Sequence, residues 1–230
     1  MPLKDELTWI DGDMPFSTTF GDQFYARADG RAEADYVFIQ GNNLPERWRS
    51  AKAFAIGELG FGTGLNFLET WRQWEVLRTQ DQKLRFVSFE AYPMPFEHMA
   101  KAIGRWPELA EVSMQFQSAS QTLHPGANLF QLDEQTELQI IVGDAREQLS
   151  SLSVPVDAWF LDGFSPAKNP QLWEATLLNQ LAAKTVLGGT FATYTAASWV
   201  RRNLQAAGFE VEKRPGFGTK REMMVGKLPI

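Results

Sequence analysis

The sequence predicts an α/β fold built on a doubly wound, mostly parallel sheet, and three observations support this prediction. From residue 53 onward, short apolar runs alternate with segments of helical periodicity. Four of the apolar runs end in a glycine turn or an acidic residue, as strands of an open α/β sheet do beside a ligand. The last two runs are joined by residues 215–218 with no helix between them, so we expect an antiparallel last strand.

Residues 1–50 are expected to form an N-terminal hairpin or lid segment, and residues 51–230 the main part of one globular domain. The hairpin is predicted from Asp29-Gly30, a favourable turn dipeptide, between the segments 23–26 and 36–39. The breaker-rich segment 41–45 then ends any strand.

The elements after residue 50 follow from periodicity and turn residues. The apolar runs predict strands at 53–58, 84–89, 138–142, 156–161, 190–195, 209–213 and 223–228. The helical patterns predict helices at 65–77, 94–103, 170–187 and 196–207. Gly188-Gly189 and Gly208 are expected to end the last two helices. Residues 105–136 show no clear period, and no element is predicted there.

The composition excludes several classes of protein. Hydrophobic residues make up 44% and charged residues 22% of the 230 residues, which excludes a disordered chain. The absence of cysteine excludes disulfides, thiolate metal sites and a cysteine nucleophile. His98 and His124 are isolated and show no metal spacing, so no metal site is expected. Residues 1–6 lack the apolar run of a signal peptide and no run is long enough to span a membrane, so we expect a cytoplasmic protein.

A glycine-rich turn, Gly60-Phe61-Gly62-Thr63-Gly64, follows the first predicted strand and lets the backbone approach a ligand closely. Its spacing is GxGxG and not the GxGxxG of dinucleotide-binding turns. Glu58 precedes the turn, where a carboxylate repels a pyrophosphate and suits a cationic ligand. S-adenosylmethionine, with its sulfonium and α-amino groups, is such a ligand. The alternative is a tight strand-to-helix turn that holds nothing.

Polar residues also follow the second and third predicted strands. Glu90 ends the second strand, where a carboxylate accepts hydrogen bonds from ribose hydroxyls, unless it is a solvated strand end. Asp144 and Ala145 follow the third strand, where Asp144 suits the amino group of adenine and equally suits the N-cap of the next helix. Because the carboxyl ends of parallel strands meet at one edge of a sheet, these residues are expected to converge on one crevice.

Asp162 ends the fourth predicted strand and is followed by Phe164 and Pro166. In amine-methylating enzymes, this place carries a short acidic or amide residue, then proline and an aromatic residue, which grip a planar substrate and its nitrogen. We therefore interpret Asp162 as the catalytic residue that faces the amine, acting as a base or as an orienting group. A capping aspartate is the alternative.

The net charge of −6 argues against a nucleic-acid partner, but the charge is unevenly distributed. Residues 201–230 carry seven basic and three acidic residues, a net +4, and the first 200 residues carry −10. The basic pairs Arg201-Arg202 and Lys220-Arg221 alternate with aromatic residues and glycine turns. Such a patch holds phosphates at non-specific strength, and ordinary solvated charge is the alternative.

Three segments together resemble the methyltransferase domain of MnmC-type enzymes. They are residues 58–67 around the glycine turn, residues 157–170 around Asp162, and residues 216–223. The resemblance covers nearly the whole chain, from Phe20 to Met223. Members of that family complete the 5-methylaminomethyl-2-thiouridine modification at the wobble position of certain tRNAs.

The resemblance implies a class I S-adenosylmethionine-dependent methyltransferase with a Rossmann-like doubly wound sheet. The methyl group would pass to the primary amine of 5-aminomethyl-(2-thio)uridine in the anticodon region of tRNA. By position, the residues that would hold the cofactor are Glu58, Gly60, Gly62, Gly64, Asn66, Glu90, Asp144, Ala145, Tyr25 and Asn42. Those that would contact the target nucleotide or tRNA are Phe164, Pro166, Lys168, Arg201, Arg202, Lys220 and Arg221.

One departure from the family concerns the oxidase. Bifunctional members continue into a flavin-dependent oxidase domain, whereas this chain ends at Ile230 without a second glycine fingerprint. If the chain is complete, it resembles the stand-alone methyltransferases, and its amine substrate would come from a separate oxidase or other amine-forming enzyme. A domain cut from a longer protein is the alternative.

Three other functions stay open on the residues alone. They are a methyltransferase for another amine, an NAD-dependent oxidoreductase, and a binding module without activity. The GxGxG spacing and Glu58 disfavour NAD. Since methylation of a pyrimidine carbon commonly needs a thiolate, the lack of cysteine favours transfer to nitrogen or oxygen.

Overall fold

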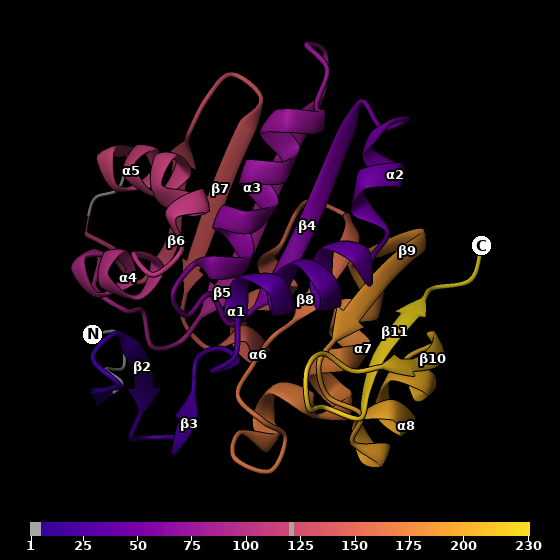
Figure 1. Cartoon of the computed structure of the whole chain (residues 1–230). Coiled ribbons are helices and arrows are strands. Elements are labelled where there is room, and N and C mark those ends of the chain that lie inside the picture. The colour runs from indigo at the N-terminus through magenta and orange to yellow at the C-terminus, as the bar shows by residue number, and fades with distance from the viewer. Residues whose placement is uncertain (1–5, 120–121) are drawn as a thin grey trace.

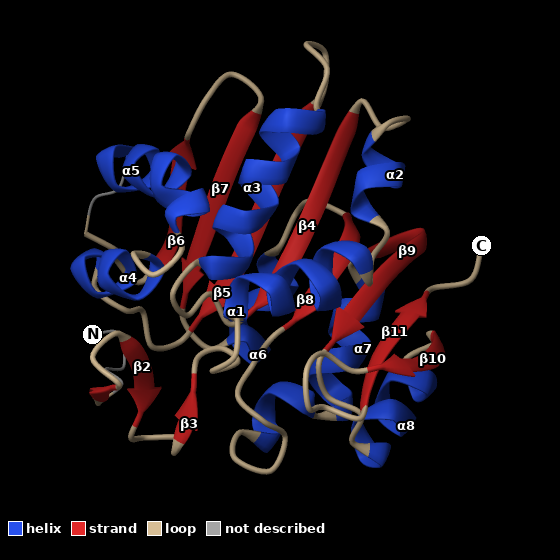
Figure 2. Ribbon diagram, viewed as in Figure 1, coloured by secondary structure: helices blue, strands red, loops and turns tan. Residues whose placement is uncertain are grey.

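An eight-stranded sheet forms the middle layer of the computed structural model, which describes residues 6–119 and 122–230 (Figures 1 and 2). In spatial order its strands are β10 (Glu210–Pro215), β11 (Glu222–Lys227), β9 (Thr185–Thr193), β8 (Val156–Leu161), β4 (Ala53–Leu59), β5 (Lys83–Glu90), β7 (Thr136–Val142) and β6 (Gly126–Gln131). A separate small sheet near the N-terminus contains β1 (Leu7–Ile10), β2 (Met14–Ser17) and β3 (Asp22–Gln23).

The five inner strands, from β9 to β7, are parallel to their neighbours in this group. From β4 the chain builds outward through β5 and β7, and then returns to the other side of β4 to form β8 and β9. The strand order therefore reverses between β4 and β8, and ligands of open α/β sheets bind at the carboxyl ends of the strands beside such a reversal.

Helices cover both faces of the main sheet (Figure 1). The α-helices are α1 (Gly30–Ala34), α2 (Leu44–Trp48), α3 (Leu65–Leu77), α4 (Phe96–Ile103), α5 (Ala110–Ala119), α6 (Ala145–Gln148), α7 (Ala175–Ala183) and α8 (Ser198–Ala206). A π-helical segment spans Asp35–Gln40, and short 3-10 turns span Pro107–Leu109, Leu149–Ser151 and Pro170–Trp173.

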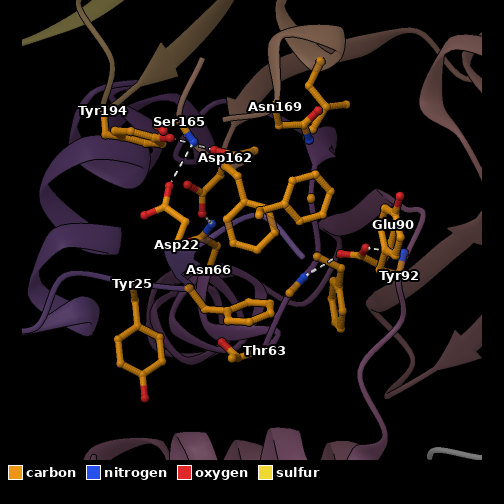
Figure 3. Close-up of a pocket in the computed structure, with 18 of the residues that line it drawn as sticks. Asp22, Tyr25, Thr63, Asn66, Glu90, Tyr92, Asp162, Ser165, Asn169 and Tyr194 are labelled. Carbon is orange, nitrogen blue, oxygen red and sulfur yellow. Dashed lines mark hydrogen bonds between the residues drawn. The ribbon is translucent and has the colours of Figure 1, made fainter. Parts of the chain in front are cut away.

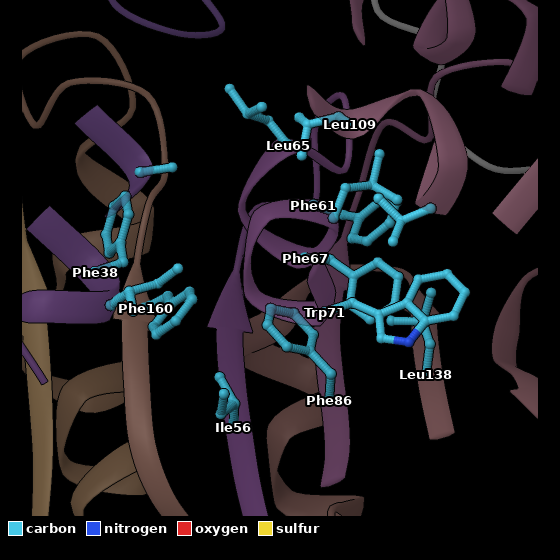
Figure 4. Packing of buried hydrophobic residues seen from close by; sticks show 14 of the residues in the cluster. Phe38, Ile56, Phe61, Leu65, Phe67, Trp71, Phe86, Leu109, Leu138 and Phe160 are labelled. Atoms are coloured by element: carbon cyan, nitrogen blue, oxygen red, sulfur yellow. The ribbon is translucent and has the colours of Figure 1, made fainter. Parts of the chain in front are cut away.

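The central strands are apolar on both faces because helices cover both. In β8, Phe160 packs into one hydrophobic cluster with the side chains of α3, whereas Trp159 and Leu161 pack into a second cluster with those of α7 and α8. Successive residues of a strand point to opposite faces, which explains this division. Figure 4 shows the first cluster, in which Phe86 and Phe160 meet edge to face with ring centroids 5.7 Å apart.

The structure confirms the mostly parallel sheet and the antiparallel end of the chain. Strand β11 pairs antiparallel with both β10 and β9. The seven predicted strands after residue 50 are all present, with ends that differ from the predicted ones mostly by one or two residues. The predicted helices at 65–77, 94–103 and 196–207 are present as α3, α4 and α8.

The predicted hairpin in residues 23–39 is wrong. Asp29-Gly30 begins α1, because the Asp29 side chain accepts a hydrogen bond from the Ala32 amide and caps the helix. The apolar segment 36–39 lies within the π-helical segment, where Val37, Phe38 and Ile39 are buried. Burial against the sheet therefore overrides the β preference of this segment.

The predicted end of a helix at Gly188-Gly189 is also wrong. Helix α7 ends at Ala183, and both glycines lie inside β9. The pairing of β8 with β9 shifts register between Val156 and Ala158, so the glycines belong to an irregular, bulged stretch of strand. Gly188 has a φ of +75°, which explains why glycine occupies this position.

Residues 105–136, for which no element was predicted, contain a 3-10 turn, α5 and the antiparallel edge strand β6. Residues 1–5, which form most of the segment used to exclude a signal peptide, lie outside the described residues. In the part of the chain that the structure describes, no helix has both the length and the apolar character needed to cross a membrane.

Candidate functional site

A cavity of about 400 Å³ lies at the carboxyl ends of the central strands (Figure 3). Its floor is formed by the turns that follow β4, β5, β7 and β8, and its cover by residues 20–38 of the N-terminal segment. The cavity therefore occupies the edge where the strand order reverses, as the sequence predicted for the crevice.

Contacts with neighbouring residues, and not only the cavity, explain why glycines occupy the turn after β4. Gly60 has a φ of +92°, and a Cβ atom built on it would lie 2.6 Å from the carbonyl oxygen of Asp162. Gly62 has a φ of +54°, and its Cβ would lie 3.1 Å from the ring of Phe24. Glycine is thus required at position 60 for the close approach of β4 to the end of β8, and at position 62 by the cover of the cavity.

Glu90, at the end of β5, braces this turn. Its carboxylate accepts hydrogen bonds from the Gly62 amide at 2.9 Å and from the Tyr92 amide at 2.7 Å (Figure 3). The carboxylate lines the cavity, so it remains placed for the predicted contact with ribose hydroxyls.

Asp144, after β7, is the N-cap of α6 and accepts a hydrogen bond from the Arg146 amide at 2.9 Å. Its carboxylate also pairs with the Arg146 guanidinium, whose hydrogen bonds lower the pKa of Asp144. Asp144 and Ala145 both line the cavity. The capping alternative is therefore present in the structure, and the predicted adenine contact is compatible with it.

Asn66, on the first turn of α3, joins two carboxyl groups. Its side-chain amide donates to Asp162 Oδ2 at 2.6 Å and to Glu58 Oε1 at 3.0 Å. The Ser88 hydroxyl donates to the other Glu58 oxygen at 2.6 Å. Asn66 and Asp162 line the cavity, whereas Glu58 is fully buried behind Asn66 and is not part of the cavity wall. Glu58 therefore does not contact a ligand in the cavity directly, although it is coupled electrostatically to Asp162 and Glu90 of the wall.

Burial makes both carboxyl groups weak acids. Desolvation is the largest cause in each case, and it raises the pKa of Glu58 to about 8 and that of Asp162 to about 7. Asn66 opposes the shift of both pKa values, and the nearby Glu33 carboxylate adds to the shift of Asp162. At neutral pH, Glu58 is therefore mainly protonated, and Asp162 can both accept and release a proton.

Replacing Glu58 with glutamine is expected to flatten the pH dependence of stability. Because the pKa of Glu58 is higher in the folded chain than its unfolded value of about 4.3, its stabilising effect is complete below pH 4.3 and is lost as the pH rises towards 8. Urea unfolding of both proteins at pH 5 and pH 8 measures this loss. We expect Glu58→Gln to reduce the decrease in unfolding free energy by one to a few kcal/mol, at about 1.4 kcal/mol per unit of pKa shift. Parallel pH profiles for the two proteins would contradict the assignment.

The structure changes the interpretation of the two N-terminal residues predicted to hold the cofactor. Tyr25 contributes to the cavity wall, but its hydroxyl points away from Asp162 and donates to the Ala102 carbonyl oxygen at 3.3 Å (Figure 3). Asn42 is buried outside the cavity, where its amide donates to the carbonyl oxygens of Phe38 and Trp159. Asn42 therefore ties the π-helical segment to the sheet, and its predicted cofactor contact is corrected.

The turn after β8 carries the residues predicted to grip the substrate. Phe164 lines the cavity and stacks on Phe20, with ring centroids 4.7 Å apart. Pro166 is buried outside the cavity wall. Lys168 forms an ion pair of 3.2 Å with Asp22 and also donates to the Gly21 carbonyl oxygen, so its charge is used to fasten the cover of the cavity. Lys168 lies outside the cavity wall, and its predicted position near the target nucleotide stays a prediction.

The predicted phosphate-binding residues fall into two groups. Arg202 on α8 and Arg221 before β11 are exposed, and no ion pair with either occurs among residues 6–119 and 122–230. Arg201 is half-buried on α8. Lys220 lines the cavity, and its ammonium group forms an ion pair of 2.7 Å with Glu33. Lys220 is therefore part of the cavity wall, and because its side chain is 40% exposed, its predicted contact with tRNA phosphates stays a prediction.

Sequence reasoning missed several residues of the cavity wall. Asp22, Phe24 and Glu33 lie in the N-terminal segment, and the last two fall within the incorrectly predicted hairpin. Tyr194 follows β9, at the carboxyl end of a predicted strand, and this position was the signal that could have identified it. No group of three or more His, Asp or Glu residues suited to a metal ion occurs in the described ranges.

Comparison with known proteins identifies a family. A family model described as S-adenosyl-L-methionine-dependent methyltransferase matches residues 107–229. The bifunctional protein MnmC of tRNA 5-methylaminomethyl-2-thiouridine biosynthesis from Aromatoleum aromaticum is 46% identical over 229 residues, which cover 99% of this chain and 36% of that protein. The protein of the same name from Chromohalobacter salexigens is 44% identical, covering 97% of this chain and 33% of the relative. The chain thus spans about one third of the length of these relatives.

Solved structures show the same fold. The crystal structure of MNMC2 from Aquifex aeolicus superposes with a TM-score of 0.78 at 24% identity, covering 97% of this chain and 70% of that one. TrmN from Thermus thermophilus superposes with a TM-score of 0.51 at 15% identity, covering 90% of this chain and 55% of that one. These likenesses concern the fold of the chain.

Proposed function

The chain belongs to the S-adenosyl-L-methionine-dependent methyltransferase family, and from this premise we propose that it methylates the primary amine of 5-aminomethyl-(2-thio)uridine at the wobble position of tRNA. The product is 5-methylaminomethyl-(2-thio)uridine. One observation carries the proposal. The Asp162 carboxyl stands in an acidic cavity beside aromatic side chains, in a chain that aligns almost completely with relatives named for biosynthesis of this nucleoside.

The cavity suits S-adenosylmethionine better than a dinucleotide. Five carboxyl groups line it, from Asp22, Glu33, Glu90, Asp144 and Asp162, against the cationic groups of Arg146 and Lys220. A pyrophosphate would face this excess of negative charge, whereas a sulfonium and an α-amino group are attracted by it. The carboxyl groups of the wall therefore suit S-adenosylmethionine, which supports the methyltransferase and disfavours the NAD-dependent oxidoreductase.

The residues that would hold S-adenosylmethionine follow from their places in the wall. Glu90 would accept hydrogen bonds from the ribose hydroxyls, and Asp144 with Ala145 would border the adenine. Asn66 and the turn that begins at Gly60 would border the methionine end. When bound, the cofactor supplies an electrophilic methyl group. This methyl group would pass to the amine nitrogen, with the sulfur of the cofactor as the leaving group.

The acceptor amine must lose a proton before it can attack. For an alkylamine with a pKa near 10.4, forming the neutral amine at pH 7 costs roughly 4.6 kcal/mol. Asp162, whose pKa burial raises to about 7, is matched to accept this proton near neutral pH. The Asn66 amide holds the Asp162 carboxyl in place, so that the group also orients the amine.

An aromatic wall beside Asp162 suits a flat base. Phe164 stacks on Phe20 and meets Phe24 edge to face, with ring centroids 5.2 Å apart. A wobble base lies in a single-stranded loop, where it leaves its stack at low cost and stacks on aromatic side chains. The wall therefore supports a nucleobase as the substrate in preference to a small aliphatic amine.

A nucleoside assay tests the proposed function. Transfer RNA that carries the free 5-aminomethyl group is incubated with the protein and labelled S-adenosylmethionine, and its nucleosides are analysed by mass spectrometry. We expect one labelled methyl group on the wobble nucleoside. Label on another nucleoside, or transfer only to small amines, would refute the proposal, and equilibrium binding of NAD instead of S-adenosylmethionine would favour the oxidoreductase.

The exposed arginines are proposed to contact tRNA phosphates. Reversing both charges in Arg202→Glu/Arg221→Glu is expected to weaken tRNA binding. The slope of the logarithm of the binding constant against the logarithm of the salt concentration should decrease in magnitude by about one to two. Binding is measured at several salt concentrations. Lys52→Glu, at the opposite ends of the strands, is the matched control and should leave the slope unchanged. Equal slopes for the double variant and the unchanged protein would exclude this surface.

The substrate of this reaction must be supplied by another activity. We propose that a separate oxidase or another amine-forming enzyme produces the 5-aminomethyl group before this protein acts. A tRNA substrate also supports the cytoplasm as the place of the reaction. Addition of such an enzyme to tRNA that lacks the free amine should make methyl transfer depend on both proteins.

A further inference from the structure

Lys220 places a positive charge at the wall of the cavity, where its side chain is 40% exposed. Its ammonium nitrogen lies 2.7 Å from Glu33 Oε1 and 4.1 Å from the centroid of the Tyr194 ring. The Lys220 amide is hydrogen-bonded to the Phe217 carbonyl oxygen at 3.0 Å, which closes the turn between β10 and β11. Three distant parts of the chain therefore meet around this one ammonium group.

Both partners of the ammonium group are themselves held in place. The Glu33 side chain is buried, and its second oxygen accepts a hydrogen bond from the Ala26 amide at 3.0 Å. The Tyr194 hydroxyl donates to the Gly163 carbonyl oxygen at 2.7 Å, directly after Asp162. The Lys220 side chain is 40% exposed, so these two held partners, and not burial of the lysine, determine the position of its charge.

Asp162 differs from three other carboxylates of the wall. Those three have cationic partners, in the pairs Asp22–Lys168, Glu33–Lys220 and Asp144–Arg146. The hydrogen-bond partner of Asp162 is the neutral amide of Asn66. Glu33 on α1 and Lys220 change the pKa of Asp162 in opposite directions. Glu58 on β4 and the Tyr194 hydroxyl are further titratable groups coupled to Asp162.

Other charged groups around Lys220 are more distant or already paired. The Asp22 carboxylate on β3 contributes to the raised pKa of Tyr194 and forms an ion pair with Lys168. Arg221 follows Lys220 in sequence and is exposed. On the hairpin itself, Lys213 and Glu222 form a pair of 2.7 Å. Of the two basic residues that line the cavity, Lys220 is therefore the one that contacts Glu33 and Tyr194, whereas Arg146 pairs with Asp144.

Resting on the proposed function, we propose that Lys220 is a positioning residue that keeps the acceptor amine and Asp162 in their deprotonated forms, with Glu33 and Tyr194 holding its charge in place. An ammonium group on the substrate would be attracted by the Glu33 and Asp162 carboxyls of this corner, and the like charge of Lys220 offsets part of that attraction. Lys220 therefore favours the neutral amine more than the same cavity without Lys220 would. The amine's proton passes to the Asp162 carboxylate or to water. The nitrogen lone pair is then available for the methyl carbon, and the leaving electron pair goes to sulfur.

Two substitutions of opposite charge test this role. Lys220→Met removes the positive charge, so the acid limb of the pH profile of kcat/KM should move to higher pH by about one unit, which is roughly a tenfold loss on that limb. Glu33→Gln removes the negative charge and should move the limb to lower pH. Lys220→Arg keeps the charge and should restore most of the profile. A merely structural role predicts loss in both variants without opposite shifts.

Two further measurements separate the possible failures. Lys213→Met is the matched control, because it breaks an ion pair on the same hairpin. It should leave the acid limb of the pH profile of kcat/KM unchanged. S-adenosylmethionine affinity should change little in Lys220→Met. If the unchanged protein methylates tRNA but the limb is the same in Lys220→Met, this inference is wrong. If the unchanged protein methylates no tRNA nucleoside, the proposed function itself is wrong.

Discussion

Asp162→Ala is expected to lower the rate of methyl transfer by about 10²- to 10⁴-fold, while the affinity for S-adenosylmethionine changes by less than about tenfold. The rate decreases because the substitution removes both the proton acceptor and the group that orients the amine. The affinity is largely kept because Glu90, Asp144 and the glycine turn are unchanged. Single-turnover kinetics together with equilibrium binding measures the two effects separately.

The conservative substitution Asp162→Asn distinguishes the two roles. Asparagine can orient an amine through its carbonyl oxygen but cannot accept a proton at neutral pH. If Asp162 is the base, the unchanged protein loses activity as the pH falls below about 7, the value to which burial raises its pKa, and Asp162→Asn lacks this limb. Retention of the limb in Asp162→Asn would assign the base to another group.

A carboxylate on the same strand provides the control. Asp157 lies at the other end of β8, outside the cavity, where it accepts a hydrogen bond from the Ala55 amide at 2.8 Å. Asp157→Asn keeps an acceptor oxygen and is expected to leave kcat within about twofold. Near-normal turnover in Asp162→Ala would show that Asp162 has no part in the reaction.

Gly60→Ala is expected to destabilise the fold by about 2–5 kcal/mol and to reduce methyl transfer in the molecules that remain folded. An L-residue at a φ of +92° is strained, and the added Cβ would lie 2.6 Å from the carbonyl oxygen of Asp162. Relief of this overlap requires the ends of β4 and β8 to separate, which displaces Asp162. Urea unfolding measures the stability, and single-turnover rates below the unfolding transition measure the activity.

A second glycine separates backbone strain from the overlap. Gly126 has a φ of +86°, and a Cβ on it would meet nothing within 4 Å. Gly126→Ala should therefore cost about 1 kcal/mol, from strain alone, and leave the methyl-transfer rate unchanged. Equal losses in the two variants would show that contact with Asp162 does not determine the requirement for glycine at position 60.

Much of the fold was predictable because its signals are local. The strands β4, β5, β7 and β8 were recognisable because a strand covered on both faces is mostly apolar, with few polar positions among the buried ones. The residues that follow these strands, from the glycine turn to Asp162, were predictable for a related reason. In a parallel sheet the carboxyl ends of the strands share one edge, so a residue that directly follows a strand in the sequence lies at that edge in the structure.

The errors share a physical cause. The segment 36–39 and Gly188-Gly189 satisfy the local rules for a strand and a helix end, but contacts with distant residues decide their conformations. Covering the sheet buries Val37 and Phe38 in a helical segment, and pairing with β8 draws both glycines into β9. Local preferences are worth less than about 1 kcal/mol per residue, and burial of large side chains exceeds this.

The sequence by itself determined the sheet, the edge at which a ligand binds, and the acidic residues delivered to that edge. Only the tertiary structure decided which of them face the cavity. It placed Glu58 behind Asn66 and removed Asn42 to the interior. It also turned Lys220 inward to Glu33, 187 positions away. The reason is that strand order follows from local patterns along the chain, whereas the surroundings of a charge depend on segments that meet only after folding.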